Sequence, residues 1–260
     1  MDSTLPELTP EQAKRYSRHI ILPNMDWEGQ ERLVNSRVLV LGAGGLGCAA
    51  AQYLAASGVG HLTIVDDDTV ELSNLQRQVL HTEARLGENK ALSAKCAIEQ
   101  LNSSIHVTAI EHRLNRSELI NMANDAHVLL DCTDNLLSRN LLNEVSVLTK
   151  RPLITGAAIR FEGQVACFFP SSKGEEQTPC YACLSYLFGE QNLSCMEAGV
   201  ISPLVGIVGA MQALEAVKYL SRVGGFRVGK LLIFDALTTQ WQELNVQLNA
   251  HCHICSHNSA

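Results

Sequence analysis

The chain has 260 residues, of which 46% are hydrophobic and 18% are charged, so its composition is that of an ordinary globular protein. This length suits one large domain with a substantial buried core. The net charge of -7 and the pI of 5.7 leave no basic field that would attract a phosphate backbone or anionic lipid. We therefore expect neither nucleic acid nor a membrane as a partner.

The N-terminus and the cysteines bear on the cellular compartment. Residues 1–11 are polar and acidic and lack the cationic start and apolar run of a secretory signal. The uncharged stretch Ala198 to Met211 contains Pro203, and it is shorter than the roughly 20 residues of a membrane-spanning helix. We therefore expect a cytoplasmic protein. Nine cysteines in a reducing compartment favour metal ligands or reactive thiols over disulfides.

A helical arm is expected before the first strand. Thr9 and Pro10 are typical of a helix N-cap and a first helical residue, and the helix would run from Glu11 to Ile21. It would carry Arg18. We assign residues 1–36 to this N-terminal arm.

Strands and helices alternate in the next segment. The expected strands are Val38–Leu41, Leu62–Asp66, Val107–Ile110 and Val128–Asp131, and the expected helices are Leu46–Ser57, Lys90–Leu101 and one that ends near Thr149. This alternation predicts an α/β fold with a Rossmann-like, doubly wound parallel sheet over residues 37–150, whose ligands bind at the carboxyl ends of the strands.

The pattern changes after Pro152. The expected strands are Leu153–Ala157, Gly163–Phe169, Lys230–Phe234 and Gln242–Gln247, with few helices between them, which favours antiparallel strands that extend the sheet. Pro203–Leu220 predicts a buried helix with Gly206 and Gly209 at close-packing positions. Ser171–Gln177 and Leu184–Glu197 are expected to be mobile. Residues 151–260 would be the second half of a single domain, 1–260.

A glycine turn, Gly42-Ala43-Gly44-Gly45-Leu46-Gly47, follows the first strand. A helix N-terminus after such a turn holds phosphates, and Asp66 at the end of the second strand is placed to accept hydrogen bonds from a ribose, although Asp68 could do so instead. Alone, this pattern also fits an NAD-dependent oxidoreductase, or glycines needed only for packing. Arg77 and Lys90 favour ATP, because a triphosphate brings about four negative charges that cations must offset.

Asp134 and Asn135 follow the fourth strand. A carboxylate at this edge can hold Mg²⁺ on a triphosphate, and Asn135 can reach phosphate or base. Asp134 would serve equally well as the N-cap of the next helix.

Four cysteines form two Cys-x-x-Cys pairs: Cys180, Cys183, Cys252 and Cys255. Two such pairs complete a tetrahedral Zn²⁺ site, which would be structural because it leaves no open position; a redox motif is the alternative. Cys195 lies outside this set, and we expect it to have no obligatory role.

Six motifs in order resemble the MoeB/ThiF/HesA family of adenylyltransferases, which are related to ubiquitin-activating enzymes. These motifs are Arg15–Leu22, Gly42–Gly47, Ser73–Arg77, Asp131–Asn135, Gly156–Gln164 and Pro179–Cys183. Leu184–Val200 resembles the MoeB branch of molybdenum cofactor synthesis more than the ThiF branch of thiamine synthesis.

The resemblance implies ATP-dependent adenylation of the C-terminal glycine of a small ubiquitin-like sulfur carrier that ends in Gly-Gly, with release of pyrophosphate. The carrier would be MoaD-like, with a ThiS-like carrier as the alternative. The resemblance also implies a homodimer in which Arg18 reaches the partner's site. A separate protein would donate sulfur, because no rhodanese-like domain follows Cys255.

The resemblance further implies residue roles. It places Gly45 and its turn beneath the phosphates, Asp66 on the ribose and Asp134 on Mg²⁺. The full expected nucleotide set is Gly42, Gly44, Gly45, Gly47, Asp66, Asp68, Ser73, Asn74, Gln76, Arg77, Lys90, Asp134 and Asn135. Arg18, Arg77, Lys90 and Asp134 are expected to be catalytic. In ubiquitin-activating relatives a cysteine accepts the acyl group, and Cys195 is the candidate here.

Overall fold

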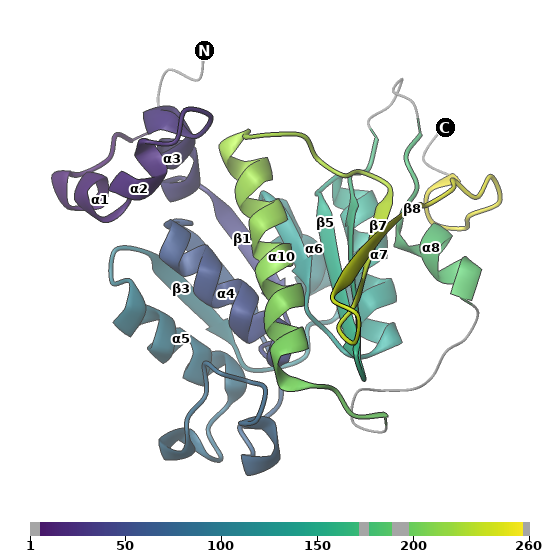
Figure 1. The fold of residues 1–260 in the computed structure, drawn as a ribbon, viewed down its shortest axis with the longest axis horizontal. Coiled ribbons are helices and arrows are strands. Elements are labelled where there is room, and N and C mark those ends of the chain that lie inside the picture. The colour runs from purple at the N-terminus through teal and green to yellow at the C-terminus, as the bar shows by residue number, and fades with distance from the viewer. Residues whose placement is uncertain (1–5, 172–176, 189–197, 257–260) are drawn as a thin grey trace.

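A computed structural model, which describes residues 6–171, 177–188 and 198–256, contains one eight-stranded sheet (Figure 1). The strand order is β3-β2-β1-β4-β5-β6-β7-β8. The strands are β1 (Arg37–Leu41), β2 (His61–Val65), β3 (His106–Ile110), β4 (Val128–Asp131), β5 (Leu153–Ile159), β6 (Glu162–Phe168), β7 (Lys230–Asp235) and β8 (Gln240–Asn245).

The sheet has a parallel half and an antiparallel half. Strands β3, β2, β1, β4 and β5 pair in parallel, and β5 to β8 pair antiparallel. This confirms the predicted Rossmann-like sheet with an antiparallel extension. Because β2 and β4 flank β1 on opposite sides, the chain changes direction across the sheet at β1, where open α/β sheets bind ligands.

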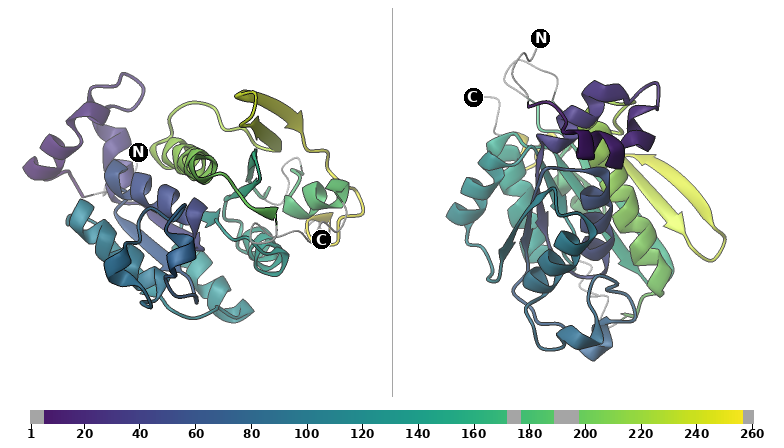
Figure 2. Two further views of the ribbon diagram at one scale, coloured as in Figure 1. Left: turned by 60° about the horizontal axis from the view of Figure 1, so that its bottom comes forward. Right: turned by 90° about the vertical axis from the view of Figure 1, so that its left-hand side faces the viewer.

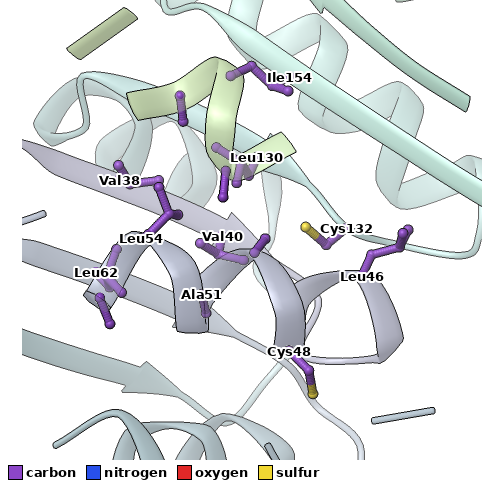
Figure 3. Close-up of a cluster of buried hydrophobic side chains, with 14 of the residues drawn as sticks. Val38, Val40, Leu46, Cys48, Ala51, Leu54, Leu62, Leu130, Cys132 and Ile154 are labelled. Atoms are coloured by element: carbon purple, nitrogen blue, oxygen red, sulfur yellow. The ribbon is translucent and has the colours of Figure 1, made fainter. Parts of the chain in front are cut away.

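Helices cover both faces of the sheet (Figure 2). One face carries α4 (Gly45–Ser57), α5 (Lys90–Leu101) and α10 (Ser202–Ser221), and the other carries α6 (Arg116–Asp125), α7 (Leu136–Thr149) and α8 (Tyr181–Phe188). Each face has its own apolar core. In the first, Leu54 of α4 packs with Leu62 of β2 and Leu130 of β4, all fully buried (Figure 3).

Helix α10 is long and apolar enough to cross a membrane by length and composition, but 56% of that stretch is buried within the protein. It packs against α4, and a Cβ on Gly209 would lie 2.3 Å from the carbonyl oxygen of Leu46. The predicted close packing is therefore correct at Gly209. It is wrong at Gly206, where a Cβ would meet open space. We conclude that α10 is a core helix.

The N-terminal arm contains α1 (Pro10–Arg15), α2 (Ser17–Ile20) and α3 (Asp26–Val34). Thr9 caps α1 as predicted, in a capping box with Gln12. The expected single helix is broken at Tyr16, whose hydroxyl lies within hydrogen-bond distance of Asn102 and Ser104. These tertiary bonds tie the arm to the end of the sheet where the strands begin (Figure 1).

Other boundaries differ from the expected ones. The second strand ends at Val65, which leaves Asp66 as the first residue beyond it. Short 3-10 helices at Leu72–Asn74 and Glu83–Arg85 interrupt the loop that leads to α5. Helix α6 was not predicted. Two segments were expected to be mobile, 171–177 and 184–197. Residues 184–188 of the second belong to α8, whereas residues 172–176 and 189–197 lie outside the described part.

Candidate active site

A cavity of about 450 Å³ opens at the carboxyl ends of β1, β2 and β4. Nine of the predicted nucleotide residues line it: Gly42, Gly44, Gly45, Asp66, Asp68, Arg77, Lys90, Asp134 and Asn135. The position agrees with the ligand site expected for a doubly wound sheet. The fold therefore brings most of the predicted nucleotide residues together in one cavity. Their roles in binding stay predictions.

The glycine turn requires glycine for steric reasons. Gly42 has a φ of +97°, and a Cβ there would lie 2.7 Å from the carbonyl oxygen of Cys132. A Cβ on Gly47 would lie 1.9 Å from the carbonyl oxygen of Gly42. Gly47 is absent from the cavity wall, so its evident role is to let α4 approach the turn.

Asp66 fixes the turn. Its Oδ2 accepts a hydrogen bond of 2.7 Å from the Ala43 N–H, and its Oδ1 accepts one of 2.9 Å from the Asp68 N–H. Burial raises the pKa of this carboxyl, whereas the two backbone donors lower it. Each carboxylate oxygen retains acceptor capacity for a further donor, such as a ribose hydroxyl.

Lys90 and Asp68 form an ion pair of 2.8 Å between Nζ and Oδ2. The lysine side chain is only 8% exposed, whereas the aspartate is 67% exposed. The preceding residue, Asn89, caps α5 by accepting hydrogen bonds from the N–H groups of Ala91 and Leu92. The cap fixes Lys90 as the first residue of the helix, with its ammonium at the cavity wall.

The segment from Ser73 to Arg77 enters the cavity only in part. Arg77 lines it and donates from Nη1 to the Ser73 carbonyl at 3.1 Å. Asn74 is buried, and its Oδ1 has no hydrogen-bond partner among the described residues. Ser73, Asn74 and Gln76 do not line the cavity.

Asn135, rather than Asp134, is the N-cap of α7. Its Oδ1 accepts a 2.9 Å hydrogen bond from the Ser138 N–H. Asp134 is exposed at the cavity wall, and no hydrogen bond or ion pair engages its carboxylate within the described ranges. Of the two interpretations left open for Asp134, the N-cap is therefore wrong, and its carboxylate is available to a ligand.

A buried ion pair holds the loop between β4 and α7, which carries Asp134, in place. Asp131 is fully buried, and its Oδ2 lies 2.8 Å from Arg139 Nε of α7. Arg139 also donates to the carbonyl oxygens of Thr133 and Gly156. Thr155 completes the network by donating to Asp131 at 2.6 Å. These bonds fix the backbone that carries Asp134.

Among the charged and amide side chains that line the cavity, sequence reasoning missed Asp67, Gln78 and Arg113. Arg113 pairs with Asp67 at 3.4 Å. Gln78 is buried, and its Oε1 has no partner among the described residues, while its Nε2 would lie 3.6 Å from a Cβ on Gly44. Arg113 follows β3, and the rule that ligands bind at strand carboxyl ends could have identified it. Gln78 directly follows the Ser73–Arg77 motif.

The four cysteines of the two Cys-x-x-Cys pairs come together beside α7. All four Sγ atoms lie within 4.8 Å of one another, and Cys180 and Cys252 are 3.7 Å apart. A tetrahedral site with Zn–S bonds of about 2.3 Å places thiolates about 3.8 Å apart, so the cluster fits Zn²⁺. The cysteine pairs thus converge as predicted. Cys195 lies outside the described residues.

Arg18 is exposed on α2, at the end of the sheet where the strands begin. The cavity is lined by residues at the carboxyl ends of β1, β2 and β4. Figure 1 shows that these strands end on the side of the sheet opposite to α2, beside the loop between β2 and α5. Arg18 therefore does not enter the cavity of its own chain.

Comparison with known proteins identifies relatives over almost the full length. The chain is 47% identical to the molybdopterin-synthase adenylyltransferase of Escherichia coli over 249 residues, which cover 96% of this chain and 98% of that protein. It is 49% identical to the protein of the same name from Haemophilus influenzae over 94% of this chain and 98% of that protein. It also matches the adenylyltransferase and sulfurtransferase MOCS3 of Drosophila grimshawi at 42% identity, over 96% of this chain and 56% of the larger protein.

Solved structures share the fold. The microcin C7 biosynthetic enzyme MccB in complex with N-formylated MccA superposes with a TM-score of 0.80 and 22% identity, over 95% of this chain and 77% of the other. Escherichia coli MccB with ATP gives a TM-score of 0.78 over the same share of each chain. The ThiF family matches residues 16–255. The chain therefore belongs to the ThiF family.

Proposed function

We propose that this protein is the adenylyltransferase that activates the sulfur carrier of molybdopterin synthase. The observation that carries the proposal is the cavity, which joins a glycine turn, a lysine and an unpartnered aspartate in a chain whose relatives are named for this activity. An oxygen of the carrier's C-terminal carboxylate would attack the α-phosphorus of ATP. The bond between the α-phosphorus and the bridging oxygen would break, giving an acyl adenylate and pyrophosphate.

The charges in the cavity match MgATP better than ATP alone. Its wall has the four acids Asp66, Asp67, Asp68 and Asp134 against the three bases Arg77, Lys90 and Arg113. Two of the bases already pair with Asp68 and Asp67. An added cation is needed to neutralise a triphosphate, and Asp134 is the free carboxylate that suits Mg²⁺, which proteins bind through one or two carboxylates together with substrate phosphates. When bound, Mg²⁺ would stabilise charge on the leaving pyrophosphate.

Within this proposal the chain's own groups position the substrate. The N–H groups of the glycine turn and the cations Lys90 and Arg77 would hold the triphosphate, and Asp66 would hold the ribose. Phosphoryl chemistry of this kind depends on alignment and charge neutralisation more than on a protein nucleophile. Cys195 has no step in it.

Arg18 would act in the site of a second copy of the chain. In its own chain it lies at the far end of the sheet from the cavity, so a catalytic role requires a dimer. An arginine from the partner would also supply the cation that the acid-rich cavity lacks.

The second half of the chain would bind the carrier. Strand β8 is exposed along its whole length, with Trp241 and Leu244 on the outer edge of the sheet. Zn²⁺ on the four cysteines would hold the tail against α7 and take no part in the reaction. Because the carrier brings no sulfur of its own, a separate protein would donate it.

Carrier-dependent exchange of labelled pyrophosphate into ATP tests the proposal. A MoaD-like carrier and a ThiS-like carrier, each ending in Gly-Gly, are offered separately to the zinc-loaded protein. Exchange with the MoaD-like carrier alone is expected. Exchange with the ThiS-like carrier alone would move the protein to thiamine synthesis, and no exchange with either, from protein that binds ATP, would contradict carrier adenylation.

A further inference from the structure

His81 lies behind the glycine turn, at the junction of three segments that form the cavity wall. It is 5% exposed. Its Nε2 lies 2.9 Å from the carbonyl oxygen of Ala43 in the glycine turn, and its Nδ1 lies 2.9 Å from the hydroxyl of Ser93 on α5. The backbone N–H of His81 donates to the carbonyl oxygen of Gln78, the residue after Arg77.

The partners of His81 determine its tautomer. A carbonyl oxygen can only accept, so Nε2 carries the proton and donates it to Ala43. Nδ1 of a neutral ring then accepts, and the Ser93 hydroxyl donates to it. Burial lowers the pKa of the ring, the hydrogen bond to the Ala43 carbonyl raises it, and the cations of Lys90 on α5 and Arg85 lower it. The net shift of the pKa is downward, which favours the neutral ring. The fully buried Cys48 thiol of α4 also faces it, at 3.6 Å.

Both backbone groups of Ala43, its N–H and its carbonyl, are held by hydrogen bonds. Its N–H donates to Asp66, and its carbonyl accepts from His81 and from the Cys48 thiol at 3.4 Å. The bond between Ala43 and Gly44 is trans, so the Gly44 N–H points opposite to the Ala43 carbonyl. A carbonyl held on the buried side therefore turns the Gly44 N–H away from His81, and Gly44 lines the cavity.

The N–H groups of Gly44 and Gly45 have no acceptor among the residues that the structure describes. Free donors at a helix N-terminus bind phosphate oxygens. We propose that His81 is a positioning residue for the nucleotide: by holding the Ala43 carbonyl through Nε2–H, it fixes the Gly44 N–H toward the triphosphate, and Ser93 sets the tautomer that makes this possible. The inference rests on the proposed use of ATP and adds a residue that touches no substrate.

Variants at His81 separate this role from general packing. His81→Phe keeps an aromatic ring but loses the donor, whereas His81→Gln retains an N–H near the position of Nε2. We expect His81→Phe to raise the Kd and KM for ATP about tenfold or more, and His81→Gln to stay within about threefold of the wild type. The KM for the carrier should not change. His127→Phe is the control for the His-to-Phe change itself, because His127 is an exposed histidine whose Nδ1 accepts the Arg37 N–H at the opposite end of the sheet.

A second measurement needs no variant. In the full-length protein labelled with ¹⁵N-histidine, the shifts of the two ring nitrogens of His81 should report a neutral ring protonated at Nε2 at pH 7.5. A ring protonated at Nδ1, or a doubly protonated ring, overturns the proposal. So does a folded His81→Phe protein with the wild-type Kd for ATP. Because the Kd and the tautomer are measured without any carrier, failure of carrier adenylation would appear separately, as absent pyrophosphate exchange in the wild type.

Discussion

Among the residues that the structure describes, the ammonium of the buried Lys90 has only the exposed carboxylate of Asp68 as its ion-pair partner, at 2.8 Å. A buried cation needs a counter-charge, and here that charge is at the solvent side of the cavity. A phosphate that enters the cavity would compete with Asp68 for the same ammonium. We therefore expect a bound nucleotide to displace Asp68 from Lys90.

This relationship predicts opposite effects of two substitutions. Lys90→Met should raise the KM for ATP at least about tenfold, because a charged hydrogen bond contributes about 1.5–3 kcal/mol. Asp68→Asn should leave that KM unchanged or lower it, because a competitor of the phosphate is removed. Steady-state pyrophosphate exchange measures both. An equal rise in the KM for ATP in the two variants would instead indicate that Asp68 binds the nucleotide.

Asp134 and Asn135 should separate into a reaction role and a folding role. Asp134→Ala should lower kcat about 100-fold or more without changing the melting temperature, because no described residue forms a hydrogen bond or ion pair with its carboxylate. Asn135→Ala removes an N-cap worth about 1 kcal/mol, which corresponds to about 2–4 °C in Tm. Thermal unfolding and exchange rates measure the two effects. A marked fall in Tm for Asp134→Ala would argue for a structural carboxylate.

A subunit-mixing experiment tests the predicted role of Arg18. Arg18→Ala and Asp134→Ala should each be inactive. Mixed dimers of the two would contain one site with both changes and one with neither, so equal mixing should restore about one quarter of the wild-type rate. If Arg18 acted within its own chain, no activity would return on mixing.

Zinc should be present at about one ion per chain and should depend on the cysteine cluster. Cys252→Ser should lose the ion and lower the melting temperature, because it removes one of four thiolates. Elemental analysis and thermal unfolding provide the readouts. The control is Cys96→Ser, since Cys96 on α5 lies outside the cluster and should retain full zinc content.

Stability should fall as the pH drops below 6.5. Burial lowers the pKa of His61, His81 and His127, so in acid the unfolded chain takes up protons that these native imidazoles do not. The effect fades as the pH rises above 6.5, because the imidazoles of the unfolded chain then become neutral as well. Asp66, whose pKa is raised, contributes in the opposite direction but equally in each variant. His81→Gln should therefore lose less stability than the wild type between pH 7 and 5, as measured by urea unfolding.

Much of the fold follows from local patterns. Helix α5 begins and ends at the predicted residues, because Asn89 provides a cap and the small residues have helical spacing. Helix α6 was missed because it is mostly polar, although Asn115 and Glu118 form a capping box that marks its start. The break at Tyr16 could not be predicted, because it depends on Asn102, which is 86 residues away.

The candidate site was predictable where a motif marks it. Asp66, Lys90 and three glycines of the turn, Gly42, Gly44 and Gly45, line the cavity as the sequence predicted. The sequence could not predict that Asn135 rather than Asp134 is the N-cap of α7, because both residue types cap helices well and only the backbone geometry decides. His81 carries no pattern of its own, since its function depends on three segments that only folding brings together.

The four-cysteine cluster links positions 72 residues apart along the chain. During synthesis the parallel half of the sheet can form its strands and helices as soon as it emerges, whereas a four-thiolate site cannot exist until Cys252 and Cys255 have been made. We therefore expect Zn²⁺ to bind only after both cysteine pairs have been made. In a cell short of zinc, chains should accumulate in which the cavity at the strand ends has formed but residues 252–255 are not held against α7.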